Sequence, residues 1–246
     1  MSRLPELSLF FPCYNEADNL ERIVADAIAA LPLVADHFEI ILVDDCSTDA
    51  TPEVAARLVA AHAGIVRTVR HARNQGYGGA LRTGFAEARA AAVAFTDGDA
   101  QFRVADLARL TPLLDPQTVV VGVRTHRADP FVRRLYARIY RLALIVCFGL
   151  GARDVDCAMK LFPTAVLRDL RVRSDGAFFS AELLLKLRAR GIHVAEVGVP
   201  HYPRTAGSPT GAKPQVILRA IRDFWWLRLA RWVAPARAAR EGRPLR

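Results

Sequence analysis

Cysteine is scarce in this chain, and its pattern is unlike that of a disulfide-stabilised or zinc-binding protein. The 246 residues include 4 cysteines, and no two of them have Cys-x-x-Cys spacing or a histidine cluster beside them. Disulfide frameworks occur in short, cysteine-dense chains, and structural zinc needs closely spaced thiolate and imidazole ligands. We therefore expect free thiols and a reducing compartment.

Long apolar runs are missing as well. A membrane-spanning helix needs about 20 apolar residues, and the nearest candidate, residues 142–151, is shorter and follows several arginines. The first residues, 1–6, contain no apolar core of the kind found in secretory signals. We expect no transmembrane helix and no signal peptide. A cytoplasmic protein is predicted, and attachment to the inner face of a membrane stays possible.

Acidic residues are outnumbered by basic ones. The chain has 34 Lys and Arg against 25 Asp and Glu, which gives a formal net charge of +9. Such a balance favours an anionic partner, which can be nucleic acid, the phosphates of a nucleotide or an anionic lipid surface. With 52% hydrophobic residues, the chain can build the core of one large α/β domain.

Apolar strands alternate with amphipathic helices through the first half of the chain. Strands are expected at 7–11, 39–43, 65–69, 92–96 and 119–123, and helices at 19–31, 51–61, 78–91 and 104–114. This alternation predicts a mainly parallel sheet with helices on both faces.

The pattern changes after residue 123. Helices are expected at 131–149, 178–190 and 216–233, a strand at 193–199 and a loop at 203–214. We predict a single domain over residues 1–233, with a nucleotide-binding half at 1–123 and an acceptor-binding half at 124–233, followed by a basic, unordered tail at 234–246.

Two carboxylates follow the fourth expected strand. Asp97 and Asp99 are separated only by Gly98, which leaves room for a ligand to approach the backbone. Carboxylates at the end of a buried strand favour a nearby cation, and Mg²⁺ or Mn²⁺ commonly bridges one or two carboxylates to substrate phosphates. For an isolated Asp-x-Asp, an acidic turn is the simpler interpretation.

The ends of other expected strands also carry polar residues. They are Tyr14 to Glu16, Asp44 and Asp45, and Asn74. Ligands of parallel sheets bind outside the carboxyl ends of the strands. Asp45 can accept hydrogen bonds from a base or ribose, or cap the next helix. The glycine-rich segment 74–79 can approach a phosphate at a helix N-terminus or form a simple loop.

Arginines and tryptophans are concentrated in the second half. Arg124 ends the fifth expected strand, and bidentate guanidinium groups suit phosphate recognition. Arg204 lies in the flexible loop at 203–214, which can act as a lid. Trp225 and Trp226 fit a lipid boundary, a nucleic-acid stacking surface or an ordinary packed helix.

Seven motifs together resemble the family 2 inverting glycosyltransferases with the GT-A fold. The likeness is strongest to dolichyl-phosphate mannose synthases and bacterial polyprenyl-phosphate glycosyltransferases. The motifs occur in the family's order and cover residues 7–220 in large part; they lie at 11–16, 43–49, 74–80, 97–101, 154–160, 178–184 and 204–208. The middle residue Gly98, Ala158 and the segment 208–210 depart from the family's usual pattern.

The resemblance assigns roles to individual residues. It implies that the nucleotide sugar is held by Pro12, Tyr14, Glu16, Asp44, Asp45, Asn74, Asp97 and Gly98. It implies a divalent metal, Mg²⁺ or Mn²⁺, on Asp97, Asp99 and Gln101. It implies an acceptor phosphate on Arg124, Arg133, Arg134 and Arg204. The catalytic candidates are then Asp99, Arg124, Glu182 and Arg204.

The function expected from the resemblance is metal-dependent transfer of a hexose from a GDP-mannose or UDP-glucose type of donor to a polyprenyl or dolichyl phosphate. The helices at 131–149 and 216–233 would dock on an anionic membrane surface, directly or through a membrane protein. A hydroxyl acceptor is the main alternative, with Glu182 or Asp156 as the base. A non-catalytic sugar-nucleotide binder and a nucleic-acid-binding protein are further alternatives, and no nucleic-acid partner is predicted.

Overall fold

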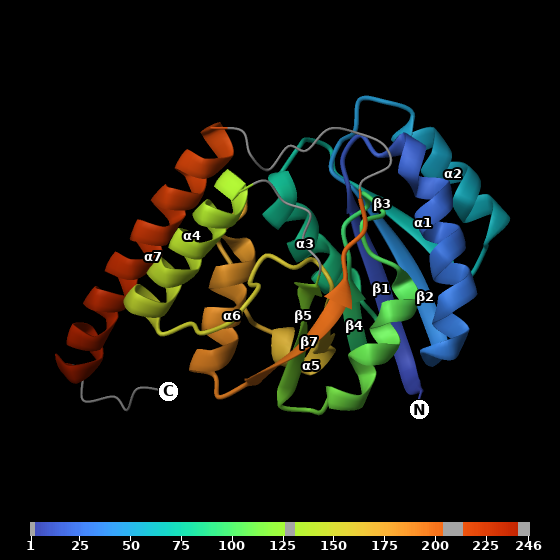
Figure 1. The fold of residues 1–246 in the computed structure, drawn as a ribbon. Coiled ribbons are helices and arrows are strands. Elements are labelled where there is room, and N and C mark those ends of the chain that lie inside the picture. Colours follow the sequence, from blue (N-terminus) through green and yellow to red (C-terminus); the bar gives the residue numbers. More distant parts are fainter. Residues whose placement is uncertain (1–2, 126–130, 204–213, 241–246) are drawn as a thin grey trace.

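The computed structural model describes residues 3–125, 131–203 and 214–240, with the backbone alone at 131–136, 214 and 230–240. These residues form an α/β structure around one seven-stranded sheet, which has the strand order β3-β2-β1-β4-β6-β5-β7 (Figure 1). The strands are β1 (Leu4–Cys13), β2 (Ala35–Asp44), β3 (Val66–Arg70), β4 (Ala92–Phe95), β5 (Thr118–Thr125), β6 (Lys160–Pro163) and β7 (His193–Pro200).

Helices surround this sheet. They are α1 (Ala17–Ala30), α2 (Thr51–Ala61), α3 (Gly76–Glu87), α4 (Phe131–Phe148), α5 (Thr164–Leu167), α6 (Phe179–Ala189) and α7 (Pro214–Arg240). Short 3₁₀ helices occur at η1 (Leu31–Leu33), η2 (Val104–Arg109) and η3 (Thr111–Leu113). The GT-A type of fold and the mainly parallel sheet predicted from the sequence are confirmed.

Three details of the sequence prediction are wrong. Strand β6 was missed, because its four residues are too short to show a period. The helix expected at 104–114 is two 3₁₀ helices, and Pro112, near the start of η3, has no N–H to continue one helix. Helix α7 runs to Arg240, so the first part of the tail predicted to be unordered from residue 234 is helical.

The order of the strands decides where ligands can bind. The chain proceeds from β1 through β2 to β3, then returns past β1 to form β4 on its other side. Since parallel crossovers are right-handed, the reversal moves the connecting helix to the other face, so α3 lies opposite α1 and α2. The reversal creates a topological switch point between β1 and β4, which is where open α/β sheets bind ligands.

The antiparallel strand β6 keeps the later strands in the same orientation. β6 runs antiparallel to both β4 and β5, so β5 has the direction of β4. The carboxyl end of β5 therefore lies at the same edge of the sheet as the carboxyl ends of β1, β2 and β4. Arg124, the penultimate residue of β5, is thereby brought to the edge that carries Asp97.

The core is a cluster of aromatic rings between the sheet and α3. Phe85 of α3 lies 5.0 Å from Phe10 of β1 and 5.3 Å from Phe162 of β6, measured between ring centroids. It also stacks at 6.5 Å on Phe179 of α6, so α3 and α6 cover the same face. This packing fixes α3, whose first turn borders the site.

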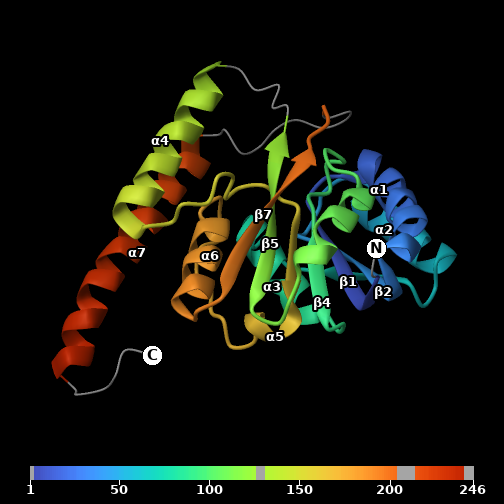
Figure 2. The same cartoon turned by 60° about the horizontal axis from the view of Figure 1, so that its bottom comes forward.

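Helices α4 and α7 lie side by side beyond α6, at the end of the molecule away from α1 and α2 (Figures 1 and 2). Phe224 of α7 joins them to the body, with its ring centroid 5.0 Å from Phe148 of α4 and 5.9 Å from Phe178. Within the described ranges, no helix combines the length and the hydropathy needed to cross a bilayer.

Candidate active site at the carboxyl edge of the sheet

The centre of the candidate site is the acidic pair that follows β4. Asp99 is 6% exposed, and Asp97 Oδ1 accepts a hydrogen bond of 2.9 Å from the hydroxyl of Tyr77 in α3. Burial and the neighbouring Asp99 charge raise the pKa of Asp97 to about 7, against the opposing effects of Lys160 and Arg124. The pair therefore has a strong electrostatic preference for a proton or a cation.

Gly98 brings this pair against the end of β1. A Cβ atom added at Gly98 would lie 3.2 Å from the carbonyl oxygen of Pro12, 3.5 Å from Sγ of Cys13 and 3.6 Å from Cγ of Glu16. A larger residue at this position would push the acidic turn away from β1. The structure thus brings together Pro12, Glu16 and Gly98, which the sequence predicted to share one site.

Backbone strain is concentrated in the loops of this edge. Asn15, Cys46 and Ala100 have positive φ values of 57°, 61° and 56°, and they follow β1, β2 and β4 respectively. The left-handed conformation is unfavourable for an alanine, which has no side-chain polar group to compensate. Sequence reasoning did not identify Ala100, because an alanine carries no signal of unusual φ.

The donor atoms of the acidic pair fit a hard divalent cation. Asp99 Oδ1 accepts a hydrogen bond of 3.1 Å from the backbone N–H of Gln101, and the side-chain amide of Gln101 donates to the carbonyl of Tyr202 at 3.1 Å. Across the described part of the chain, no group of three or more His, Cys, Asp and Glu residues has metal-binding geometry. Two carboxylates suit Mg²⁺ or Mn²⁺ when phosphate oxygens and water complete the coordination.

Asp45 organises the glycine-rich loop before α3. Its carboxylate accepts hydrogen bonds from the backbone N–H groups of Gln75 at 2.7 Å and Gly76 at 2.8 Å. It also contacts Nδ1 of His71 at 2.6 Å, and Asn74 donates to its carbonyl at 3.1 Å. Sequence reasoning missed His71. Its position directly after the end of β3 was the signal that could have identified it.

The remaining residues predicted to bind the nucleotide also lie at this edge. Asp44 Oδ1 accepts from the N–H of Ser47 at 2.9 Å, and Arg70 forms an ion pair with Asp44 at 3.1 Å. The backbone carbonyl of Glu16 accepts hydrogen bonds at the start of α1. Its side-chain carboxylate accepts a hydrogen bond of 2.6 Å from the side-chain amide of Asn19. Tyr14 is 46% exposed, so its ring is accessible to a ligand.

Arg124 reaches the site from β5 in a fixed orientation. Its Nε and Nη2 atoms donate to Oδ2 and Oδ1 of Asp154 at 2.8 and 2.7 Å. This pairing and its hydrogen bonds raise the pKa of Arg124 above its usual range. Asp154 was part of a recognised motif, but sequence reasoning gave it no role.

Three predicted phosphate-binding arginines are not placed. Arg204 lies outside the described residues, and only the backbone of α4 is described at Arg133 and Arg134. Their assignment to an acceptor phosphate stays a prediction.

Glu182, whose catalytic role stays a prediction, is held by several hydrogen bonds and an ion pair. Its side chain is buried, and its carboxylate accepts from the N–H groups of Arg173 at 3.0 Å and Ser174 at 2.8 Å. It also forms an ion pair with Lys186. These hydrogen bonds lower the pKa of Glu182 against the effect of its burial, so the group is a poor proton acceptor that holds the segment before α6.

Lys160 is a buried cation that the sequence analysis did not single out. Its ammonium group donates to the carbonyl of Cys157 and to Oγ of Ser180, and it lies 5.3 Å from the centroid of Phe95. Burial lowers the pKa of Lys160, whereas nearby acidic groups, Asp97 among them, act to raise it. Lys160 and Asp97 are thus electrostatically coupled, and each favours the charged form of the other.

Comparison with known proteins agrees with this geometry. The family model described as Glycosyl transferase family 2 matches residues 8–171. An uncharacterized glycosyltransferase of Mycobacterium bovis is 31% identical over 224 residues, which make up 89% of this chain and 96% of that protein.

The names of two further relatives contain a dodecaprenyl phosphate and a dolichyl phosphate. A dodecaprenyl-phosphate galacturonate synthase of Rhizobium johnstonii is 27% identical over 205 residues, covering 82% of this chain and 60% of the relative. A dolichyl-phosphate beta-glucosyltransferase of Saccharomyces cerevisiae is 27% identical over 219 residues, covering 78% of this chain and 66% of the relative. This chain therefore spans about three fifths to two thirds of the length of these two relatives.

A solved structure shares the fold. Glucosyl-3-phosphoglycerate synthase from Mycobacterium tuberculosis, in complex with Mn²⁺, uridine-diphosphate-glucose and phosphoglyceric acid, superposes with a TM-score of 0.68 at 21% identity, covering 89% of this chain and 80% of that chain. The family match and the Mycobacterium bovis relative show that the chain belongs to glycosyl transferase family 2.

Proposed function

We propose that this glycosyltransferase moves a hexose from a nucleoside diphosphate sugar to a polyprenyl phosphate at a membrane surface, with inversion and with the help of a divalent metal. The observation that carries the proposal is the acidic pair at the carboxyl end of β4, with Arg124 at the same sheet edge. Two relatives carry dodecaprenyl phosphate and dolichyl phosphate in their names, and this supports a polyprenyl phosphate as acceptor.

Asp97 and Asp99 would hold the metal, with Gln101 beside them. When bound, the metal offsets the negative charge that develops on the departing diphosphate. Two contacts of this chain support such a metal seat, because Gly98 keeps the pair against β1 and Tyr77 orients Asp97. The loops after β1 and β2 would then hold the base and ribose of the donor.

Arg124 would position the acceptor phosphate. Asp154 accepts hydrogen bonds from its Nε and Nη2 atoms, and Nη1 would be the atom that donates to a phosphate oxygen. A phosphate acceptor is already anionic at neutral pH and needs positioning by cations more than it needs a general base. The engagement of Glu182 with the segment 173–174 is consistent with a reaction that lacks a base at this position.

Attachment to a membrane would use the paired helices α4 and α7. Both expose large apolar side chains, namely Ile139, Leu142, Ile145 and Val146 on α4, and Ile217, Leu218, Ile221, Trp225, Trp226 and Leu229 on α7. Exposed apolar side chains alternating with arginines are typical of helices that lie at a lipid interface. Such an arrangement would bring the active-site edge to the lipid-linked acceptor.

The test is a transfer assay in detergent with a short-chain polyprenyl phosphate. Labelled UDP- and GDP-hexoses are supplied with Mn²⁺ or Mg²⁺, and the product is extracted into organic solvent. We expect label in the organic phase, loss of product with EDTA, and at least a thousandfold loss in the Asp99→Asn variant. Transfer to hydroxyl acceptors alone, or no transfer from any donor, would contradict the proposal.

A further inference from the structure

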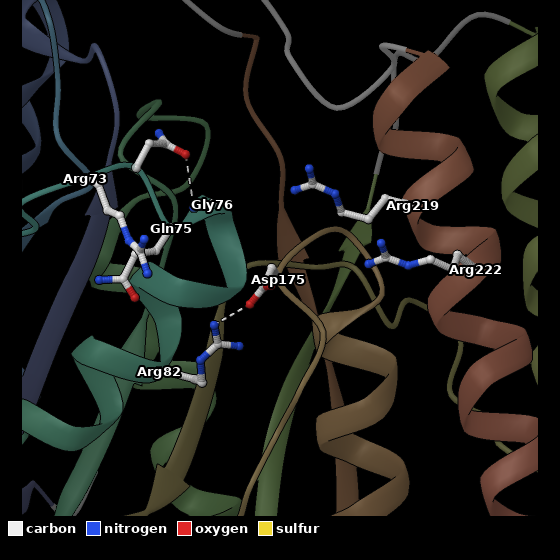
Figure 3. Close-up of a pocket in the computed structure, with 8 residues that line it drawn as sticks. Arg73, Gln75, Gly76, Arg82, Asp175, Arg219 and Arg222 are labelled. Atoms are coloured by element: carbon white, nitrogen blue, oxygen red, sulfur yellow. Dashed lines mark hydrogen bonds and ion pairs between the residues drawn. The ribbon is translucent and has the colours of Figure 1, made fainter.

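A cavity of about 580 Å³ lies between the first turn of α3, the segment before α6 and helix α7 (Figure 3). Arg73 and Arg82 line it from the side of the sheet, and Arg219 and Arg222 line it from α7. Asn74, a predicted nucleotide-binding residue, also borders the cavity, but neither Asp97 nor Asp99 belongs to its lining, and nothing in the proposed transfer reaction uses these four arginines. The cavity therefore needs a separate explanation.

Positive charge is in excess around this cavity. Its lining has four guanidinium groups and a single carboxylate, that of Asp175, which forms an ion pair with Arg82. Arg222 contacts Asp223 on its own helix at 2.9 Å. Arg73 and Arg219 have no carboxylate partner within the ranges that the structure describes. Like charges that converge on one hollow favour the binding of an anion.

Two glycines make room for Arg219 to reach across from α7. A Cβ atom at Gly176 would lie 3.4 Å from Cδ of Arg219, and one at Gly76 would lie 3.9 Å from its Nη1. Gly76 also has a φ of +77°, and its Cβ would lie 2.8 Å from the carbonyl oxygen of Asp175. The side chain of Arg219 therefore occupies a space that larger residues at these positions would reduce.

Arg82 is held on the opposite wall. Its Nη1 donates to the carbonyl of Ser174 at 3.0 Å, and its Nη2 contacts Asp175. Figure 3 shows Arg219 and Arg222 extending from α7 toward the first turn of α3, with Arg73 and Arg82 on the opposite side. The backbone N–H of Gly76 is already bonded to Asp45, so recognition in this cavity depends on the guanidinium groups.

We propose that this cavity is an anion site for a phosphate monoester, separate from the site of the nucleotide sugar. Planar guanidinium groups recognise phosphate by paired hydrogen bonds, and several of them around one hollow suit a group with two charges. The source favoured by the geometry is a phospholipid headgroup, because the helix that carries Arg219 and Arg222 also exposes Leu218 and Trp225. A free phosphate has the same chemistry.

The experiment compares the wild-type chain of 246 residues with two double variants. The variant Arg219→Gln/Arg222→Gln removes two cavity charges, and the control Arg57→Gln/Arg109→Gln removes two exposed charges elsewhere, so the net charge changes equally. Binding is measured by calorimetry in EDTA with inorganic phosphate, with monomeric dihexanoyl phosphatidic acid and with dihexanoyl phosphatidylcholine. Thermal unfolding of each variant checks that it is folded.

We expect saturable binding of phosphatidic acid to the wild type and the control, at least tenfold weaker binding to the cavity variant, and none of phosphatidylcholine. Phosphatidic acid binding tenfold tighter than inorganic phosphate would identify a lipid headgroup; equal affinities would identify a free phosphate. The site is overturned if no phosphate compound binds the wild type, or if the cavity variant binds like the control.

A second measurement separates this site from the donor site. Binding of UDP and GDP in the presence of Mn²⁺ is expected to be equal in the wild type and in Arg219→Gln/Arg222→Gln. A parallel loss of nucleotide and phosphate binding would overturn the claim of a separate site. If neither nucleotide binds any form, the proposed transfer fails, but the phosphate measurements in EDTA still decide the anion site.

Discussion

Arg124 and Asp154 form a bidentate ion pair at the carboxyl end of β5. Nε and Nη2 of Arg124 lie 2.8 and 2.7 Å from the two carboxylate oxygens, and the backbone N–H of Arg124 also donates to Asp154 at 3.1 Å. Both side chains are nearly buried, at 12% and 6% exposure. Asp154 thereby fixes both the strand end and the direction of the guanidinium group.

Removal of the Asp154 charge is expected to destabilise the protein strongly. In Asp154→Asn, Arg124 keeps its buried charge without a full counter-charge, and breaking a buried pair in this way costs about 3 kcal/mol in the free energy of unfolding. Urea unfolding measures this change. The control Arg153→Gln breaks the more exposed pair with Glu196, and we expect a loss below about 1 kcal/mol. Equal losses in both variants would contradict the interpretation.

The raised pKa of Asp97 predicts a specific dependence of stability on pH. In the metal-free protein, the folded state holds a proton on Asp97 up to pH about 7. The unfolded chain releases this proton at the ordinary aspartate pKa of about 3.9. The folded state thus binds more protons in this interval, so the free energy of unfolding falls as the pH rises from about 4 to about 7. Asp97→Asn removes this contribution.

The measurement is the difference in unfolding free energy between wild type and Asp97→Asn at a series of pH values in EDTA. We expect the variant to gain stability relative to wild type as the pH rises to about 7, with no further gain above it. Asp115→Asn is the contrasting case. Hydrogen bonds from Thr118 and Gln117 lower the pKa of exposed Asp115, so its stabilising effect is lost only as the pH falls below about 4. A flat difference for Asp97 over this range would refute the assignment.

Ala100 predicts a stabilising substitution inside the candidate site. Its φ of 56° is unfavourable for any residue with a Cβ atom, by roughly 1 kcal/mol, and glycine removes this strain. We expect Ala100→Gly to raise the free energy of unfolding by up to about 1 kcal/mol. Ala56→Gly, at an exposed position inside α2, should lower it by about 1 kcal/mol. A loss of stability in both variants would show that Ala100 is not strained.

The sequence was sufficient for the parts of the fold that depend on local pattern. The apolar runs that became β1, β2 and β4 are long enough or bounded clearly enough to be recognised, and their polar ends lie at one edge as predicted. Strand β6 escaped because its four residues gain their partners only from β4 and β5, which are distant in sequence. Antiparallel insertion into a parallel sheet leaves no local periodicity.

The candidate site likewise contains residues that the local sequence points to and residues whose part depends on distant partners. Asp97, Gly98 and Asp99 could be singled out only together with the polar residues at the neighbouring strand ends, because an isolated Asp-x-Asp is more simply an acidic turn. Lys160 could not be found in this way, because a lysine in an apolar strand gives no indication of which charges it faces. The engagement of Glu182 with the 173–174 backbone was equally hidden, since those hydrogen bonds depend on the path of the preceding loop.

We expect the substitution Gly84→Ala to destabilise the fold, although it adds only one methyl group. A Cβ atom at this position would lie 2.2 Å from the ring of Phe10, which is fully buried between α3 and β1. The strain of overpacking in Gly84→Ala should lower the free energy of unfolding by about 1–3 kcal/mol, measured by urea titration. Gly151→Ala is the matched control, because no heavy atom lies within 4 Å of its added Cβ. A change beyond about 0.5 kcal/mol in that control would count against this reasoning.

The exposed apolar side chains of α7 provide a test of the proposed membrane attachment. Leu218 is 67% exposed on α7, and Leu33 is 73% exposed in η1 at the other end of the molecule. If α7 lies in a lipid interface, Leu218→Glu loses the roughly 1.5–3 kcal/mol gained by burying a leucine, so binding to phosphatidylglycerol vesicles should weaken about tenfold or more. Leu33→Glu adds the same negative charge but should change flotation with vesicles only slightly. Equal weakening by both would indicate that charge alone governs the attachment, and no weakening by Leu218→Glu would remove α7 from the docking surface.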